Sequence, residues 1–157
     1  MTKSRRLPYQ EGDWFAVPLK SGGYAAGLVA RASRKGRILL GYFFGPRRQE
    51  PPKVEDLLSL TSGDAVLADL FGDLSLIKEE WPVVGPTPGW DHSRWPMPVF
   101  GRVEEFGGRA WRVEVPDGDP AAEPKVTPLS PKEARRLPEH HLLGAGAVEE
   151  ILEDLLS

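Results

Sequence analysis

Residues that could do acid–base or metal chemistry are scattered along this sequence. The three histidines are His92, beside Asp91, and the adjacent pair His140 and His141. Adjacent histidines cannot share the i, i+4 helical face on which a metalloprotease helix carries its zinc ligands. The chain has no cysteine, which excludes a thiol nucleophile, a disulfide framework and cysteine-based zinc sites. We therefore expect neither a metal site nor a cofactor.

Motifs of nucleophilic and nucleotide-dependent catalysis are also missing. The sequence contains no G-x-S-x-G elbow, no phosphate-binding loop that ends in G-K-S/T and no G-x-G-x-x-G fingerprint. Carboxylates are plentiful, but most lie beside glycine or at strand ends, where a turn-forming aspartate is the ordinary explanation. They include Asp13, Asp64, Asp69, Asp73 and Asp117. The sequence therefore favours a binding protein over an enzyme.

Tryptophan is the residue type that best indicates a binding surface. The chain has five, and Trp81, Trp90 and Trp95 lie within fifteen positions among prolines and glycines. A Trp-Pro pair can be a packing plug, or it can form a rigid aromatic surface that anchors an interface or stacks on a ligand. Arg94 precedes Trp95 and suits such an interface. We predict Trp81, Trp90, Arg94 and Trp95 as partner-binding residues.

Short strands must position these residues, because 16 prolines and 17 glycines divide the chain into short segments. We expect the first strands over residues 13–19, 24–31 and 37–44, with a glycine turn at residues 21–23. The third strand is apolar on both faces, which predicts cover on both sides. Residues 45–52 are expected to form an exposed loop, because their three prolines cannot continue a strand.

Further elements follow the same pattern. We expect a helical turn within 53–59, a strand over 64–71 for which a short helix is the alternative, and a short strand from Trp81. A hairpin joins residues 101–106 to 109–115 around Gly107 and Gly108. Ser130 and Pro131 begin a short helix that ends near Leu137. Residues 148–156 form an amphipathic helix, with its acidic residues outside, that covers the open side of the sheet.

Together these elements predict a single, mainly β (α+β) domain. We expect a strongly curved antiparallel sheet or partly open barrel with one or two C-terminal helices packed on it. The β-rich core spans 12–116, a proline-rich extended segment spans 117–130, and a helical cap spans 131–157. The chain has no run near the ~20 apolar residues that a membrane span requires, and no signal peptide, so we expect a soluble, cytoplasmic protein.

Charge restricts the partners. The net charge is −3, so the molecule lacks the basic footprint of non-specific nucleic-acid binding, and nucleic acid is an unlikely partner. Basic residues nevertheless gather in loops, where they form solvated surface or a dock for an acidic partner. They are Arg5, Arg6, Arg31, Arg34, Lys35, Arg37, Arg47 and Arg48. The carboxyl end is acidic instead, with Glu149, Glu150, Glu153 and Asp154.

Three separate blocks resemble the Immunity protein 26 family of bacterial polymorphic-toxin systems. The first is GDWFAVPL at residues 12–19 with its glycine turn, Tyr24 and GLV at 27–29. The later blocks are FGDLSL at 71–76 followed by WPVVG at 81–85, and WPMPVF at 95–100. The resemblance covers about residues 12–115 and implies a β-rich cytoplasmic protein that binds and neutralises a cognate toxin. It supplies no contact residues.

Three function classes remain at this point. The leading one is a non-enzymatic toxin inhibitor. It could dock through the loop that carries Trp81, Trp90 and Trp95, which we call the tryptophan loop, through the acidic last helix or through the basic loops. Of these three surfaces we predict the tryptophan loop. The second is a small-barrel module of the SH3 or Tudor kind that holds a peptide or single-stranded nucleic acid stacked on tryptophan. The third is an enzyme of unrecognised mechanism. The sequence leaves the oligomeric state open.

Overall fold

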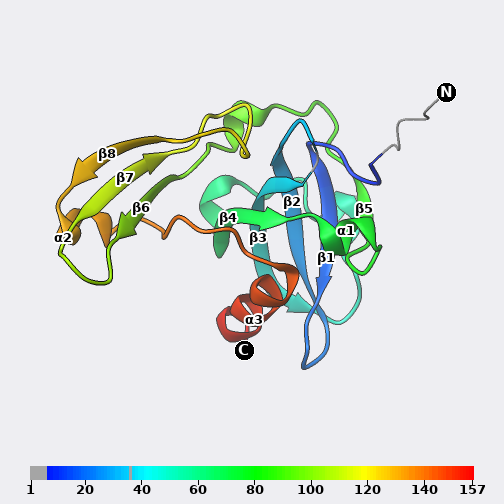
Figure 1. Ribbon diagram of the computed structural model, residues 1–157. Helices are drawn as coiled ribbons and strands as arrows, with labels where there is room; N and C mark the ends of the chain where they lie inside the picture. Colours follow the sequence, from blue (N-terminus) through cyan, green and yellow to red (C-terminus); the bar gives the residue numbers. More distant parts are fainter. Residues whose placement is uncertain (1–6, 36) are drawn as a thin grey trace.

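The computed structural model describes residues 7–35 and 37–157, which form two antiparallel sheets and a few helices (Figure 1). The five-stranded sheet has the order β4-β3-β2-β1-β5, and the three-stranded sheet has the order β6-β7-β8. The predicted fold class, a mainly β chain with a C-terminal helix packed on an antiparallel sheet, is confirmed. The strands of the described residues do not close into a barrel. Arg5, Arg6 and the predicted turn residue Gly36 lie outside the described residues.

The strands of the five-stranded sheet are β1 (Asp13–Pro18), β2 (Tyr24–Ala32), β3 (Ile38–Arg48), β4 (Leu67–Gly72) and β5 (Val83–Pro86). The turn between β1 and β2 needs its glycines, because Gly22 and Gly23 have φ of 106° and 79°. Gly27, in the middle of β2, is opposite Phe15. A Cβ at Gly27 would lie 2.3 Å from the Phe15 ring, so glycine lets this aromatic side chain pack directly on the strand.

β3 corrects one prediction, since it continues through residues 45–48, which we expected to form a loop. The register explains how a proline is accommodated there. Phe44 pairs with Ala26 and Arg48 with Tyr24, so three residues of β3 stand against one residue of β2. Pro46 lies inside this bulge, where a ladder donor is not required. The other two prolines of the segment, Pro51 and Pro52, follow the strand as expected.

Each face of the five-stranded sheet covers its own apolar core, as the two apolar faces of β3 predicted. One core lies beneath α3 (Ala145–Leu155), which buries Val148 and Leu152 against the sheet. This confirms that the last helix covers a face of the sheet. The other core joins the five-stranded sheet to the three-stranded sheet and includes Trp14, Tyr42 and Phe100.

The three-stranded sheet consists of β6 (Val99–Val103), β7 (Ala110–Glu114) and β8 (Lys125–Leu129). The β6–β7 hairpin was predicted, but residues 125–129 were expected only as an extended segment. They form an edge strand, where Pro128 is tolerated because one side of its backbone needs no partner. The predicted helix start at Ser130 is confirmed, since its Oγ accepts the Glu133 N–H at 3.2 Å at the start of α2 (Pro131–Ala134).

The remaining helices are short and connect the strands. They are α1 (Leu74–Ile77) and the 3-10 helices η1 (Val54–Asp56), η2 (Ser62–Asp64) and η3 (His92–Arg94). The helical turn predicted within 53–59 corresponds to η1, and residues 67–72 are a strand rather than the alternative helix.

The three-stranded sheet and α2, residues 99–134, form an arm that projects to one side of the five-stranded sheet (Figure 1). The chain returns from this arm through residues 138–143, which we call the strap. The Gly101 N–H donates to Pro138 O and the His140 N–H to Gly101 O, each at 2.9 Å. Leu143 then exchanges 3.0 Å hydrogen bonds with Leu70 and Gly72. The strap therefore joins an edge of the arm, β6, to an edge of the main sheet, β4.

Candidate functional site

The four predicted partner-binding residues separate onto the two faces of the five-stranded sheet. Trp81 lies in the core beneath α3. Trp90, Arg94 and Trp95 lie on the other face, where they line a cleft of about 140 Å³. We call this the tryptophan cleft; its other walls include Trp14, Leu58 and Leu60. The structure thus brings three of the four residues together and adds Trp14 from β1.

Trp95 forms the floor of the cleft rather than its exposed surface, since only 6% of the residue is exposed. Its ring makes edge contacts with Trp14 and Tyr42, at centroid distances of 6.0 and 5.2 Å. The Tyr42 hydroxyl donates to the carbonyl of Pro96, the residue after Trp95. Trp95 is therefore held in a fixed orientation by aromatic packing and by the anchored Trp-Pro pair.

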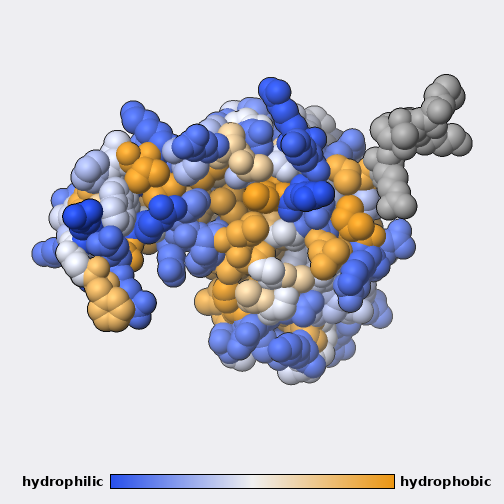
Figure 2. All heavy atoms as spheres, viewed as in Figure 1, coloured by the Kyte–Doolittle hydropathy of each residue, from blue (hydrophilic) through white to orange (hydrophobic). Residues whose placement is uncertain are grey.

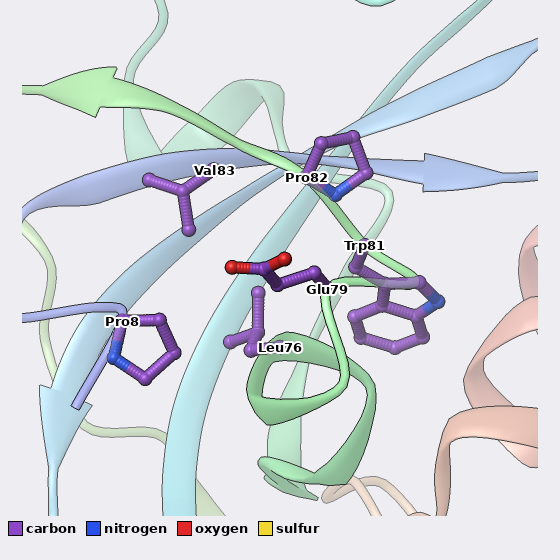
Figure 3. Close-up of a pocket in the computed structure, with 6 residues that line it drawn as sticks. All are labelled: Pro8, Leu76, Glu79, Trp81, Pro82 and Val83. Carbon is purple, nitrogen blue, oxygen red and sulfur yellow. The ribbon is translucent and has the colours of Figure 1, made fainter. Parts of the chain in front are cut away.

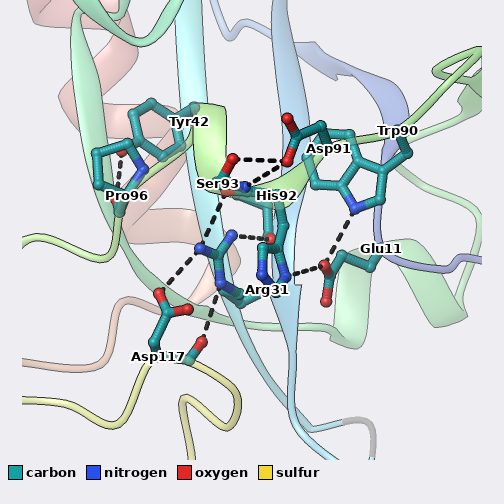
Figure 4. A network of polar contacts seen from close by, with 10 residues as sticks. Glu11, Arg31, Tyr42, Trp90, Asp91, His92, Ser93, Pro96 and Asp117 are labelled. Atoms are coloured by element: carbon teal, nitrogen blue, oxygen red, sulfur yellow. Dashed lines mark hydrogen bonds and ion pairs between the residues drawn. The ribbon is translucent and has the colours of Figure 1, made fainter.

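Trp90 is half-buried, and a polar network fixes its ring (Figure 4). Its Nε1–H donates to Glu11 Oε1 at 3.0 Å, and the same oxygen lies 3.2 Å from His92 Nδ1. The ring also covers Gly12, which has φ of 93° and where a Cβ would lie 3.0 Å from the indole. Trp90 thus presents part of an immobilised aromatic surface, with the exposed Arg94 at the rim of the cleft.

Asp91 shapes the loop that carries these residues. Its Oδ1 accepts the Ser93 N–H at 3.0 Å and the Ser93 hydroxyl at 2.7 Å, which caps η3. The hydrogen bonds from Ser93 lower the pKa of the Asp91 carboxyl. This capped turn sets the direction in which Arg94 leaves the backbone.

Arg31 holds the tryptophan loop from below and is 1% exposed (Figure 4). Its guanidinium donates to three backbone carbonyls: Nη1 to Ala30 O at 2.7 Å, Nη2 to His92 O at 3.1 Å, and Nε to Asp117 O at 2.9 Å. Nη2 also pairs with Asp117 Oδ1 at 2.9 Å. Arg31 had been placed among the solvated basic loops, and its burial corrects that reading. The one feature of the sequence that could have indicated this burial is the position of Arg31 at the end of an otherwise apolar strand.

The acidic face of α3 is partly engaged inside the molecule. Glu149 Oε1 accepts the Trp81 Nε1–H at 2.9 Å, and Glu153 pairs with Arg47 at 2.8 Å. Glu153 also accepts the Ser21 N–H, and the hydrogen bonds from Ser21 and Arg47 lower the pKa of the Glu153 carboxyl. Two of the four carboxylates expected to face outward therefore attach α3 to the sheet, which weakens this helix as a docking surface.

Asp69 and His141 meet where the strap runs alongside β4. His141 Nε2 lies 2.7 Å from Oδ2 of the buried Asp69, whose Oδ1 accepts the Leu70 N–H at 2.8 Å. Burial raises the pKa of the Asp69 carboxyl. His141 and the adjacent His140 both line a cavity of about 280 Å³ together with Pro120, Ala121, Ala122 and Pro124. Among residues 7–35 and 37–157, no three histidine or carboxylate side chains converge as metal ligands.

His140 gives the protein a pH-dependent stability. Burial, together with the charges of Arg102 and His141, lowers the pKa of the His140 imidazole below its ordinary value of 6.5. A depressed folded-state pKa contributes stability that is present above pH 6.5 and is lost as the pH falls through the folded-state pKa. We expect the free energy of unfolding, measured with urea at pH 7.5 to 5.0, to fall less in His140→Gln than in the wild type.

Leu142→Gln, at an exposed position of the strap that carries no titratable group, is the matched control and is expected to keep the wild-type dependence on pH. Asp69 acts in the opposite direction, because its raised pKa makes protonation favour the folded state. Both the wild type and His140→Gln contain Asp69, so its contribution cancels when their free energies of unfolding are subtracted at each pH. Parallel slopes for these two proteins would contradict the assignment.

Trp81 borders a larger pocket on the other side of the molecule, of about 370 Å³ (Figure 3). Pro8 and Trp81 lie on opposite sides of it, with Leu76 and Glu79 between them. Glu79, with φ of 59°, adopts the left-handed conformation that ends α1, and among the described residues it is the one titratable side chain that lines this pocket. A single carboxylate on an apolar wall offers no acid–base pair, so this pocket has no catalytic constellation.

Comparison with known proteins identifies a family. The family model described as Immunity protein 26 matches residues 10–112, from just before β1 into β7. No curated protein and no solved structure matches the chain. No helix in the described part of the chain is long and apolar enough to cross a membrane.

Proposed function

Because the chain belongs to the Immunity protein 26 family, we propose that it is a non-enzymatic immunity protein that binds and neutralises a cognate bacterial toxin. The family match over residues 10–112 of the 157 carries this proposal. We place the protein in the bacterial cytoplasm, where it protects the producing cell or its kin within a polymorphic-toxin system.

We propose the tryptophan cleft as a contact surface for the toxin. Trp90 and Arg94 are the side chains that reach its rim, and Trp95 and Trp14 form the wall behind them. Aromatic side chains that are fixed before binding lose little entropy in an interface, and arginine is enriched among the residues that contribute most to binding. Trp81 is not part of this contact surface, since it is 1% exposed and lies in the core on the opposite face of the sheet.

The test uses the toxin domain that we expect at the variable carboxyl-terminal end of a large open reading frame beside this gene. Co-expression of the wild type with that toxin is expected to restore growth. Trp90→Ala combined with Arg94→Glu is expected to weaken toxin binding by about 30-fold or more, the effect of removing an interface hot spot. Isothermal titration gives the Kd, and circular dichroism checks the fold.

Leu74→Ala combined with Arg34→Glu is the matched control, since both side chains are exposed and lie outside the cleft, in α1 and in the turn after β2. It is expected to bind as the wild type does. A folded cleft variant that binds as tightly as this control would overturn the cleft assignment. A wild-type protein that neither binds nor protects would overturn the proposed function itself.

The small-barrel module has less support, because β1 to β5 and β6 to β8 form two open sheets. A net charge of −3 also opposes stacking of a nucleic acid on the tryptophans, since its phosphates would be repelled.

A further inference from the structure

The free end of the arm carries the most exposed large apolar side chain of the described residues. Phe106, in the turn between β6 and β7, is 83% exposed. The space-filling view shows apolar colour at this end of the arm, separate from the apolar surface over the main sheet (Figure 2). A phenylalanine here adds nothing to either core, and neither core cluster includes it. Its burial against another molecule would remove most of its surface from water.

The turn that presents Phe106 has a defined backbone. Gly107 and Gly108 have φ of 113° and 71°, and the Glu104 N–H donates to Arg109 O at 2.8 Å to close the hairpin. A Cβ at Gly107 would lie 2.9 Å from the Glu104 carboxylate. The sequence Phe-Gly-Gly therefore bends the chain tightly and leaves the aromatic ring at its end.

The arm behind this turn is braced at three places. α2 packs so closely that a Cβ at Gly101 would lie 2.3 Å from Ala134 O. The strap joins β6 to β4 through the hydrogen bonds of Gly101 and Leu143, and the root of the arm packs Phe100 and Val113 into the core. A braced arm holds its end in place before any partner arrives, so binding loses little conformational entropy.

The charge beside Phe106 selects the partner. Glu104 and Glu105 immediately precede the phenylalanine, and both are exposed. No ion pair within the described residues engages either carboxylate, and Arg109 across the hairpin pairs with neither. The tip thus combines an apolar anchor with two uncompensated negative charges. Its complement is a cationic protein surface that contains an apolar pocket.

We propose that the arm tip, residues 104–108, inserts into a cationic cleft of the cognate toxin. This inference rests on the proposed function and extends it to the class of toxin, because a cationic cleft is what an enzyme that acts on nucleic acid needs in order to bind phosphates. Phe106 fills an apolar pocket in that cleft. Glu104 and Glu105 pair with the basic side chains of the toxin that otherwise contact the phosphates of its nucleic-acid substrate. The bound toxin therefore cannot bind that substrate.

The experiment measures binding to the toxin domain encoded beside this gene, inactivated by mutation, at 50 and 500 mM NaCl. We expect Phe106→Ala to raise the Kd by about 30-fold or more. We expect the wild-type Kd to rise at least about tenfold between the two salt concentrations, and Glu104→Gln with Glu105→Gln to remove most of that rise. A short RNA or DNA duplex should compete with the wild type for the toxin.

Two matched controls lie in the short helices α1 and η1, which connect strands of the main sheet. Leu74→Ala removes another exposed apolar side chain, and Glu55→Gln with Asp56→Asn removes another adjacent pair of exposed carboxylates. Both are expected to bind as the wild type does. A Kd that is unchanged in Phe106→Ala, or independent of salt in the wild type, would overturn the role of the tip while leaving toxin binding intact. No binding by the wild type would instead refute the proposed function.

Discussion

Replacement of Arg31 by alanine is expected to destabilise the protein by about 3–5 kcal/mol, the effect of breaking a buried charged network. The loss has two causes. The carbonyls of Ala30, His92 and Asp117 would lose their donor inside the protein, and an unsatisfied buried polar group costs about 1–3 kcal/mol. A cavity would also remain where the guanidinium packs. Urea unfolding at pH 7.5 measures the change.

Companion variants identify which bonds matter. Asp117→Ala removes only the carboxylate, whose side chain is 60% exposed, so we expect a loss of about 1 kcal/mol or less. Arg31→Lys keeps the charge but cannot reproduce a planar fork of donors, so it should lose most of the stability that alanine loses. Arg34→Ala, in the exposed turn nearby, should be neutral. An Arg31→Ala loss no larger than the Asp117→Ala loss would contradict the carbonyl network.

The same network connects the main sheet, the tryptophan loop and the segment that follows β7. Arg31 belongs to β2, His92 to η3, and Asp117 to the connection between β7 and β8. Relative to the wild type, we therefore expect Arg31→Ala to accelerate amide hydrogen exchange more in residues 91–95 and 116–119 than in α3. Equal acceleration in all three regions would show global unfolding instead of local release.

The sequence predicted most strands because alternation and turn glycines are local signals. The β1–β2 hairpin follows from Gly22 and Gly23, and the β6–β7 hairpin from Gly107 and Gly108. The sequence did not predict strands at residues 45–48 and 125–129, because each segment contains a proline. A proline counts against a strand unless its position in the sheet is known. A bulge at Pro46 and an edge position for Pro128 remove that conflict, and both depend on the partner strand.

The candidate site was harder to predict, because its geometry depends on residues far apart in the chain. Trp90 and Arg94 were predicted as partner-binding residues from local composition, but Trp14 was predicted only as part of the strand over residues 13–19, although it lines the same cleft. Glu149 was placed outside by the helical period, yet it bonds to Trp81, 68 residues away. A charged side chain at the border of an amphipathic helix has the same pattern whether it meets water or a buried donor.

Trp81→Ala is expected to have an effect as large as that of Arg31→Ala, about 3–5 kcal/mol, as for other large aromatic residues removed from a core. The indole stacks on Phe15 with centroids 5.7 Å apart and an angle of 4° between the planes. It also contacts Phe43 and Phe71 at centroid distances of 6.5 and 5.8 Å. Its loss would open a cavity between the sheet and α3. Urea unfolding followed by circular dichroism measures this loss.

Matched variants divide the contribution of Trp81 into packing and hydrogen bonding. Trp81→Phe keeps an aromatic ring but leaves Glu149 without its donor, so we expect a loss of about 1–2 kcal/mol. Trp111→Ala removes a half-buried tryptophan that belongs to neither core, and it should cost about 1 kcal/mol or less. Similar losses for Trp81→Ala and Trp111→Ala would contradict the central position of Trp81 in the core.

Toxin protection by Trp81→Ala then distinguishes scaffold from contact. If Trp81 only supports the fold, protection should decrease in proportion to the unfolded fraction, and growth at a lower temperature, where more of the variant is folded, should restore it. If the edge of Trp81 at the pocket with Pro8 touches the toxin, the affinity of the variant for the toxin should remain reduced even when the variant is folded. Because 1% of Trp81 is exposed, we expect the first result. A folded Trp81→Ala protein with wild-type affinity would place the toxin contacts elsewhere, at the cleft or the arm tip.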